Sequence, residues 1–405
     1  MNIFREIPPT AGWPIYIKDI FKALTHDVRQ GSLEEDFKRY LDVEYARVVT
    51  SGTVALYLIL EAIKAVSAKK TVIIPSFICP LVPLAIKRAG LKVEICDIAG
   101  DNFDFDPKQL EELCNRDDIL AIVPTHLGGI PLDFDPIRET AKKNGIFIIE
   151  DCAQSLGARY KGQLVGTLGD AAFFSLCRGK GLTIYEGGVI VTKDLSLAKL
   201  IENKIKERLK NNFFQETLKI FELFGYWIFY RPRAFWFVYR LPQLFWNLRG
   251  KKLKADLEEY DIDFPVHQVS VFRKAVGHGG FYHLEGQIKQ QREKAEYYME
   301  RLSGVKGLKV VKESALAQAS YPYITVIFDQ PQMKQRALAY FAKTNLGLSQ
   351  IYTLAISDYP YLKGIVPQRY CPAGRYLAER AITLSTSIFL DHKTILRIVD
   401  KIKQI

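Results

Sequence analysis

Residues 174–188, FSLCRGKGLTIYEGG, contain a lysine at a position where core packing does not account for a charged side chain. An apolar run ends at Ser175, and Lys180 then stands between two glycines, two residues after Arg178. Such a lysine can be a solvated loop residue, a ligand for an anion, or an amine held for covalent chemistry. Schiff-base chemistry requires a lowered ammonium pKa, which burial or a nearby cation such as Arg178 can provide.

A second motif, TSGTVAL (50–56), opens a helical run. Backbone N–H groups at a helix N-terminus, with the hydroxyls of Ser51 and Thr53 beside them, form a site for an anion. The same residues standing alone also fit a plain N-cap.

A third motif, IIEDCAQ (148–154), ends an apolar strand with Asp151. Burial of an unpaired carboxylate is costly, so Asp151 requires a cationic partner. A pyridinium nitrogen fits this requirement, and an arginine in an ordinary ion pair fits it equally. Glu186-Gly187-Gly188 is interpreted as a turn that returns the chain to the sheet.

The elements around these motifs are those of an α/β fold. Apolar runs predict strands at residues 71–75, 91–98, 119–126 and 145–152. Helical spacing precedes the first of these strands in TVALYLILEAIKAV and separates the last two in PIRETAKKNG, which favours a mostly parallel sheet covered by helices on both faces. Ligands of such sheets bind beyond the carboxyl ends of the strands, where PSFICP, PTHLGG and EDCAQ fall.

A chain of 405 residues is too long for one ordinary core. We expect a large domain over 1–203 and a smaller C-terminal α+β domain over 257–405, which begins before a long helix at about 284–303. Residues 204–256, called the aromatic insertion below, separate the two.

The bulk composition excludes several classes of protein. Six cysteines without a CxxC pair, and an N-terminus without a signal peptide, indicate reduced thiols in a cytoplasmic protein with no zinc or other metal site. The formal net charge is +11, and the aromatic insertion carries a surplus of eight of these charges, with twelve Lys and Arg against four Asp and Glu. The remainder is nearly neutral, which argues against nucleic-acid binding.

The order SGT…PSF…THLGG…EDCAQSLGARYKGQLVGTLGDAAFFSLCRGKG…EGG resembles the DegT/DnrJ/StrS-type aminotransferases. The resemblance covers nearly the whole chain and is most specific over residues 150–188. It implies a pyridoxal-phosphate-dependent transferase of fold type I, with a mostly parallel seven-stranded sheet in the large domain. It also implies a homodimer whose active site lies at the subunit boundary.

The resemblance assigns catalytic roles to two residues. Lys180 would form the Schiff base with pyridoxal 5′-phosphate, and Asp151 would keep the pyridine nitrogen protonated, so that the ring acts as an electron sink. Gln154 would lie beside the ring hydroxyl. The implied reaction moves an amino group from an amino acid, glutamate, to a keto sugar carried on a nucleotide or a lipid. Lys180 speaks against relatives that use histidine and dehydrate sugars.

The same resemblance implies the rest of the cofactor site. Ser51, Gly52, Thr53 and Ser175 would surround the phosphate. The family's stacking aromatic residue falls at Cys79, so either Phe77 compensates or the stacking is lost.

Two further positions depart from the family or stay open. The family's Asn-Tyr-Arg turn, which reaches the partner subunit's cofactor phosphate, is Val266-His267-Gln268 here, and His267 or Gln268 could donate the same hydrogen bond. His126 either lines the site or caps a strand end.

The aromatic insertion is the largest departure. It holds three of the four tryptophans, and arginines interrupt every apolar run before it reaches the roughly 20 residues needed to span a bilayer. Trp and Tyr beside Lys and Arg are typical of a segment that lies in a membrane interface. Residues 213–254 therefore suggest peripheral association with the cytoplasmic membrane face, and a subunit interface or substrate lid remains the alternative.

A non-catalytic regulatory or scaffolding relative is the second functional hypothesis. Cys79 and the missing Asn-Tyr-Arg turn favour it, whereas Lys180, Asp151 and Gln154 together oppose it.

Overall fold

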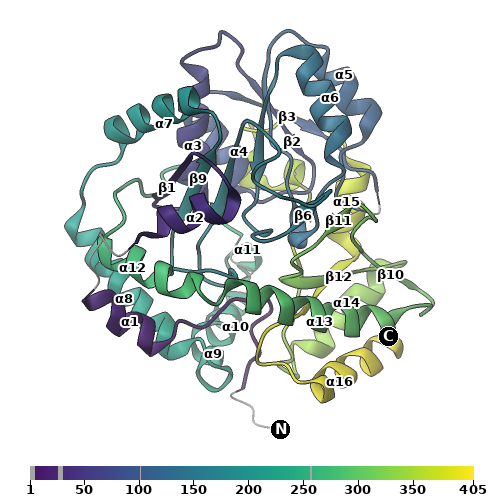
Figure 1. Ribbon diagram of the computed structural model, residues 1–405. Coiled ribbons are helices and arrows are strands. Elements are labelled where there is room, and N and C mark those ends of the chain that lie inside the picture. Colours follow the sequence, from purple (N-terminus) through teal and green to yellow (C-terminus); the bar gives the residue numbers. More distant parts are fainter. Residues whose placement is uncertain (1–4, 26–30, 101, 256–257) are drawn as a thin grey trace.

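The computed structural model describes residues 5–25, 31–100, 102–255 and 258–405. A large sheet with helices on both sides forms the first part of the molecule, and a smaller antiparallel sheet with its own helices forms the second (Figure 1). The boundary expected between residues 256 and 257 lies outside the described residues.

The large sheet has seven strands in the order β1-β9-β8-β5-β4-β2-β3. The strands β3, β2, β4, β5 and β8 run parallel, whereas β9 is antiparallel to both of its neighbours. Their bounds are β1 Tyr45–Val49, β2 Thr71–Pro75, β3 Lys92–Cys96, β4 Ile119–Ile122, β5 Phe147–Asp151, β8 Ala171–Ser175 and β9 Gly188–Thr192. The predicted mostly parallel sheet between helices is confirmed.

Alternate residues of the strands enter two different apolar clusters, as the two-residue period of a strand requires. Ile73 and Ile148 pack on the side of helices α2, α5 and α6, whereas Val72, Ile74 and Ile149 pack on the side of α3, α4 and α7. These helices span α2 Leu33–Leu41, α3 Gly52–Lys64, α4 Leu81–Arg88, α5 Pro107–Cys114, α6 Phe134–Asn144 and α7 Leu195–Arg208. Both faces are covered, so the strands read as continuous apolar runs.

The C-terminal part is built on a four-stranded antiparallel sheet in the order β10-β12-β14-β13. Its elements are α12 Val271–Phe281, α13 Leu284–Leu302, β10 Leu308–Val310, β12 Tyr323–Phe328, α14 Pro331–Phe341, β13 Leu348–Ser349, α15 Pro372–Arg380, β14 Ala381–Ser385 and α16 His392–Lys403. A small sheet of β11 (Ala317–Gln318), β6 (Arg159–Tyr160) and β7 (Gln163–Leu164) links it to the large part.

The aromatic insertion is helical. Beyond the end of α7 it contains α8 Phe213–Phe229, α9 Pro232–Val238, α10 Arg240–Leu248 and α11 Lys252–Ala255. The inner face of α8 shares an apolar cluster with α1 (Ile17–Leu24) and α12, through residues such as Leu223, Tyr226 and Ile20. Figure 1 shows α8, α9 and α10 at the same end of the molecule as α1. Among the described residues, no helix is both long enough and apolar enough to cross a membrane.

Candidate active site

A cavity of about 400 Å³ opens beyond the carboxyl ends of the central strands. The residues predicted from the sequence that line it are Ser51, Gly52, Thr53, Cys79, Asp151, Gln154, Ser175 and Lys180. They lie at the ends of strands, at the start of helix α3 or in the loops between elements of the large sheet. This is the edge at which open α/β sheets bind their ligands.

The turn between β1 and α3 presents free backbone donors to the cavity. Ser51 is the N-cap of α3, and its Oγ accepts the N–H of Val54 at 3.1 Å. The first N–H groups of a helix have no acceptor within the helix, so those of Gly52 and Thr53 remain available to an anion.

Strand β9 approaches this turn so closely that only glycine fits. A Cβ at Gly188 would lie 2.3 Å from the carbonyl carbon and oxygen of Ser51. The glycine of the EGG turn therefore does more than return the chain to the sheet. It lets strand β9 lie directly against the turn that forms the anion site.

Asp151 ends β5 with its carboxyl buried in the cavity wall. One oxygen accepts the N–H of Ala153 at 3.0 Å. Burial raises the pKa of Asp151 to about 6, against the opposing effects of that hydrogen bond and of the Lys180 charge. A carboxyl with a raised pKa lacks sufficient cationic stabilisation from the protein, which is the environment that a bound cation would correct.

Lys180 lies in the loop that joins the antiparallel strands β8 and β9. Backbone hydrogen bonds close this loop like a hairpin, from Leu176 to Gly187 and from Arg178 to Tyr185. Gly179, directly before the lysine, has a φ of +79°, a conformation that favours glycine. The N-terminal segment holds the loop from outside, since Thr10 Oγ1 donates to the carbonyl of Gly179 at 2.9 Å.

Gln154 is held by side chains of the C-terminal part. Its Oε1 accepts the N–H of Gly128 at 3.0 Å and the hydroxyl of Tyr323, and its Nε2 donates to the hydroxyl of Tyr352 at 3.5 Å. Sequence reasoning missed both tyrosines, because YPYITVIF and QIYTLA carry no sign of a partner about 170 to 200 residues earlier in the chain.

Cys79 and Phe77 are placed differently. Cys79 lines the cavity, and burial raises the pKa of its thiol to about 12. Phe77 is buried and does not belong to the cavity wall, but its ring meets the edge of Tyr352 with centroids 5.3 Å apart. The ring that reaches the cavity from this side is therefore that of Tyr352.

His126 lines the cavity wall and also closes a buried polar cluster. Its Nδ1 accepts the N–H of Leu132 at 3.2 Å, and its Nε2 lies 3.1 Å from Glu150 Oε2. Glu150 also accepts the N–H groups of Gly166, Leu168 and Gly169. His126, Glu150 and Cys152 are close enough together to hold a metal ion, but these hydrogen bonds already occupy the oxygens of Glu150.

His267 points into its own subunit. Its Nε2 lies 2.8 Å from Glu216 Oε1 on α8, and only 1% of the residue is exposed. Nε2 of the ring is therefore engaged with Glu216, whereas Nδ1 is buried and has no hydrogen-bond partner among the described residues. The expectation that His267 reaches a partner's phosphate stays a prediction. Gln268 is exposed.

The site fits pyridoxal 5′-phosphate on structural grounds. It offers a buried, under-compensated carboxyl for the ring nitrogen, a lysine, and a helix N-terminus for the phosphate. It also contains Thr125, whose side chain lies beside Asp151 and acts to lower the pKa of that carboxyl. An α/β sheet with this set of groups at its carboxyl edge defines a pyridoxal-phosphate-dependent enzyme.

The chain belongs to the DegT/DnrJ/EryC1/StrS aminotransferase family, whose model matches residues 21–223 and 268–403. It is a pyridoxal-phosphate-dependent aminotransferase, and the predicted enzyme class and cofactor are confirmed. Residues 224–267, which include most of the aromatic insertion, lie outside the match.

Curated relatives are similar over different spans. A GDP-perosamine synthase of Vibrio cholerae is 25% identical over 87% of this chain and 83% of its own length. A GDP-perosamine synthase of Escherichia coli O157:H7 is 38% identical, but over only 40% of this chain and 44% of its own length.

Solved structures share the fold. The putative sugar aminotransferase Spr1654 of Streptococcus pneumoniae, in its apo form, superposes with a TM-score of 0.77 at 18% identity, covering 98% of this chain and 97% of its own. DesV of S. venezuelae gives a TM-score of 0.73 at 22% identity over 96% and 93% of the two chains. These likenesses confirm the predicted fold type.

Proposed function

We propose that this enzyme transfers an amino group from glutamate to a keto sugar that is carried on a nucleotide or a lipid. The observation that carries the proposal is that one cavity contains Lys180, Asp151 and the Ser51–Thr53 turn. A sugar acceptor is supported by the names of the similar perosamine synthases.

Lys180 and Asp151 are the residues that we assign to catalysis. Bound pyridoxal phosphate supplies an electron sink that lowers the barrier to removing the α-proton of the amino donor. Lys180 Nζ, the amine proposed to hold the cofactor covalently, takes this proton as a general base and later delivers it as an acid. Asp151 keeps the ring nitrogen protonated, because its buried carboxylate is stabilised by a cation at that position.

The remaining residues position the cofactor. The N–H groups of Gly52 and Thr53, with the hydroxyls of Ser51, Thr53 and Ser175, are proposed to bind the phosphate. Gln154 is proposed to bind the ring hydroxyl from the position that Tyr323 gives it. Cys79 is proposed to contact the face of the cofactor ring directly, and Phe77 is proposed to act indirectly, by packing against Tyr352.

Borohydride reduction of the cofactor-loaded protein, followed by peptide mass mapping, tests the assignment of Lys180. We expect the reduced adduct on the Lys180 peptide, its loss in Lys180→Ala, and no change in Lys143→Ala, which removes an exposed lysine of α6. An adduct on another lysine would refute the assignment. An adduct on Lys180 without a glutamate-dependent change in the visible absorbance would favour the non-catalytic role instead.

The association state is part of the proposal. We propose a homodimer with the active site at the subunit boundary, as the family resemblance implies. Sedimentation equilibrium of the cofactor-loaded protein should give twice the chain mass of 46.2 kDa. A monomer at micromolar concentration with full activity would contradict it.

We also propose that residues 213–254 attach the enzyme to an anionic membrane surface. Large apolar side chains are exposed there, with Phe213 86%, Phe214 79% and Leu248 89% accessible. Cations lie among them, and the guanidinium of Arg249 stacks 4.1 Å above the ring centre of Phe245. Each Lys or Arg near an anionic leaflet contributes about 1 kcal/mol, which salt screens.

Flotation with anionic liposomes tests this attachment. We expect the protein to float at low salt and to remain in solution with neutral liposomes. A protein that stays soluble with both would refute the membrane proposal. If the exposed aromatic side chains instead become protected on dimerisation or on acceptor binding, they form a subunit interface or a substrate lid.

A further inference from the structure

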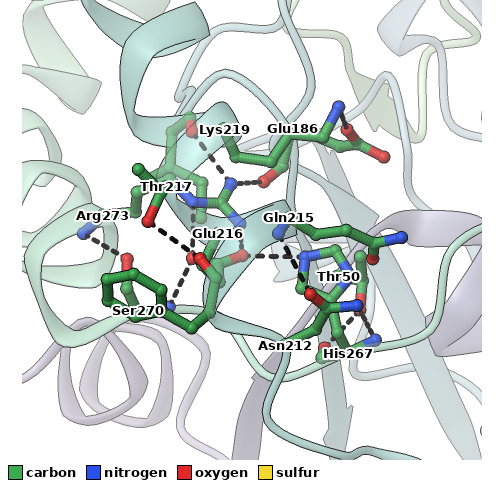
Figure 2. Close-up of polar contacts among 12 residues, drawn as sticks. Thr50, Glu186, Asn212, Gln215, Glu216, Thr217, Lys219, His267, Ser270 and Arg273 are labelled. Atoms are coloured by element: carbon green, nitrogen blue, oxygen red, sulfur yellow. Dashed lines mark hydrogen bonds and ion pairs between the residues drawn. The ribbon is translucent and has the colours of Figure 1, made fainter.

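A buried ionic cluster joins the aromatic insertion to the active site. Figure 2 shows Glu216, in the first turn of α8, with its carboxylate surrounded by donors. Oε1 lies 2.8 Å from His267 Nε2, and Oε2 accepts the N–H of Ser270 at 2.8 Å and Nε of Arg273 at 3.1 Å. Nη2 of Arg273 donates to Oε1 as well, so the ion pair is bidentate.

The carboxylate of Glu216 is ionised at neutral pH. Burial by itself raises the pKa of Glu216, but the hydrogen bonds from His267 and Arg273 outweigh it and lower this pKa to about 2. Arg273 has no exposed surface at all. Loss of the Glu216 charge would leave a fully buried guanidinium without its carboxylate partner, a change that is strongly unfavourable.

One arm of the cluster reaches the loop that carries Lys180. Nη1 of Arg273 donates to the carbonyl oxygens of Ile184 and Glu186, which lie on the return of this loop to β9. The side chain of Glu186 is held from the same helix as Glu216, since Lys219 Nζ lies 2.7 Å from Glu186 Oε2. Helix α8 therefore fixes the loop in two ways: Glu216 holds the arginine that binds the loop's carbonyl oxygens, and Lys219 binds the side chain of Glu186.

The second arm reaches the anion-binding turn. Thr50 Oγ1 donates to the carbonyl of His267 at 2.5 Å and accepts the N–H of the same residue at 3.0 Å. Thr50 directly precedes Ser51, the N-cap of α3. Glu216 holds the His267 ring, and His267 holds the start of the turn to which we assign the cofactor phosphate.

We propose that Glu216 is a positioning residue for the cofactor. Its carboxylate fixes the Lys180 loop through Arg273 and the Ser51–Thr53 turn through His267, so that the amine and the phosphate site keep their relative placement. This inference rests on the proposed roles of Lys180 and of the turn. It assigns a role to α8, the first helix that lies wholly within the aromatic insertion, and it connects that segment directly to the chemistry.

The Glu216→Gln variant tests the inference, because glutamine keeps the size of the side chain and removes its charge. Glu207→Gln is the control, since Glu207 is mostly exposed and pairs with Lys204 on the surface of α7. We expect Glu216→Gln to raise the dissociation constant of pyridoxal phosphate about tenfold, which corresponds to roughly 1.4 kcal/mol. We also expect slower borohydride trapping of Lys180 and a lower kcat with little change in KM for glutamate.

The double variant Glu216→Gln/Arg273→Gln keeps the test decisive if the single variant fails to fold. It leaves no uncompensated buried charge, and we expect it to fold and still to bind the cofactor weakly. If either folded variant binds the cofactor, traps at Lys180 and turns over like Glu207→Gln, Glu216 is only structural and the inference is overturned. If wild-type protein does not trap at Lys180, the proposed function fails instead.

Discussion

Replacing Asp151 by asparagine removes a buried charge and leaves the shape of the side chain almost unchanged. The native residue is 4% exposed, and burial raises the pKa of its carboxyl from 3.8 to about 6. In the cofactor-free protein a raised carboxyl pKa destabilises the folded state once the group ionises. The penalty is absent below pH 3.8, grows as the pH rises through about 6, and is complete above that value.

The size of the effect follows from the two pKa values. Their difference corresponds to about 3 kcal/mol at pH 8 and to roughly half of that at pH 5. Cofactor-free Asp151→Asn protein should therefore be more stable than wild-type protein by these amounts. Asparagine Oδ1 can still accept the N–H of Ala153, so the comparison isolates the charge.

Urea unfolding of both cofactor-free proteins at pH 5 and pH 8 measures the difference. Asp117→Asn, which removes an exposed carboxyl, should change stability by less than about 0.5 kcal/mol at either pH. Added pyridoxal phosphate should stabilise wild-type protein more than Asp151→Asn, because at a given concentration a ligand that binds more tightly stabilises the folded state more. If Asp151→Asn is no more stable than wild type at pH 8, Asp151 is not an under-compensated charge.

Three further outcomes follow from the geometry. Gly188→Ala should purify without cofactor, because the added Cβ would lie 2.3 Å from the Ser51 carbonyl. The control Gly286→Ala, whose Cβ would meet nothing within 4 Å, should retain the cofactor. Equal cofactor content in the two variants would contradict this reasoning. Glu216→Gln should be less stable than wild type at pH 7, and the difference should shrink as the pH falls from 4.5 towards 2, because the pKa of Glu216 is lowered in the folded protein. Urea unfolding measures this difference, and an equal difference in unfolding free energy at pH 7 and pH 3 would argue against the prediction. Tyr323→Phe should weaken cofactor binding roughly fivefold in a titration, about 1 kcal/mol, because it removes one of the two donors to Gln154 Oε1. An unchanged affinity would exclude a role for Tyr323 in orienting Gln154.

The local motifs predict the centre of the site well because each one is a strand end followed by a tight turn. The apolar runs at 71–75 and 145–152 form β2 and β5, and the parallel order brings their carboxyl ends to one edge. The motifs therefore place Asp151 at this edge, whereas the expectation that Lys180 shares the site came from the family resemblance; the structure brings both residues to one cavity.

The partners of these groups could not be predicted in the same way. Tyr323 and Tyr352 reach Gln154 from the C-terminal part, and nothing in the spacing of their neighbours indicates it. Arg273 has the sequence context of an ordinary surface arginine on an amphipathic helix, yet it is fully buried. The sequence allows His267 to be a loop residue that faces a partner, and the tertiary structure turns it towards Glu216.

The sequence by itself determined the alternation of strands and helices, the glycine-flanked lysine and the chemistry available at each strand end, because these depend on residues close together in the chain. Only the tertiary structure decided which distant side chains hold them. Burial and ion pairing are set by what packs against a residue, and the groups that meet around Glu216 come from segments far apart in the chain. The role that we propose for α8 depends on contacts between those segments, which the sequence alone does not show.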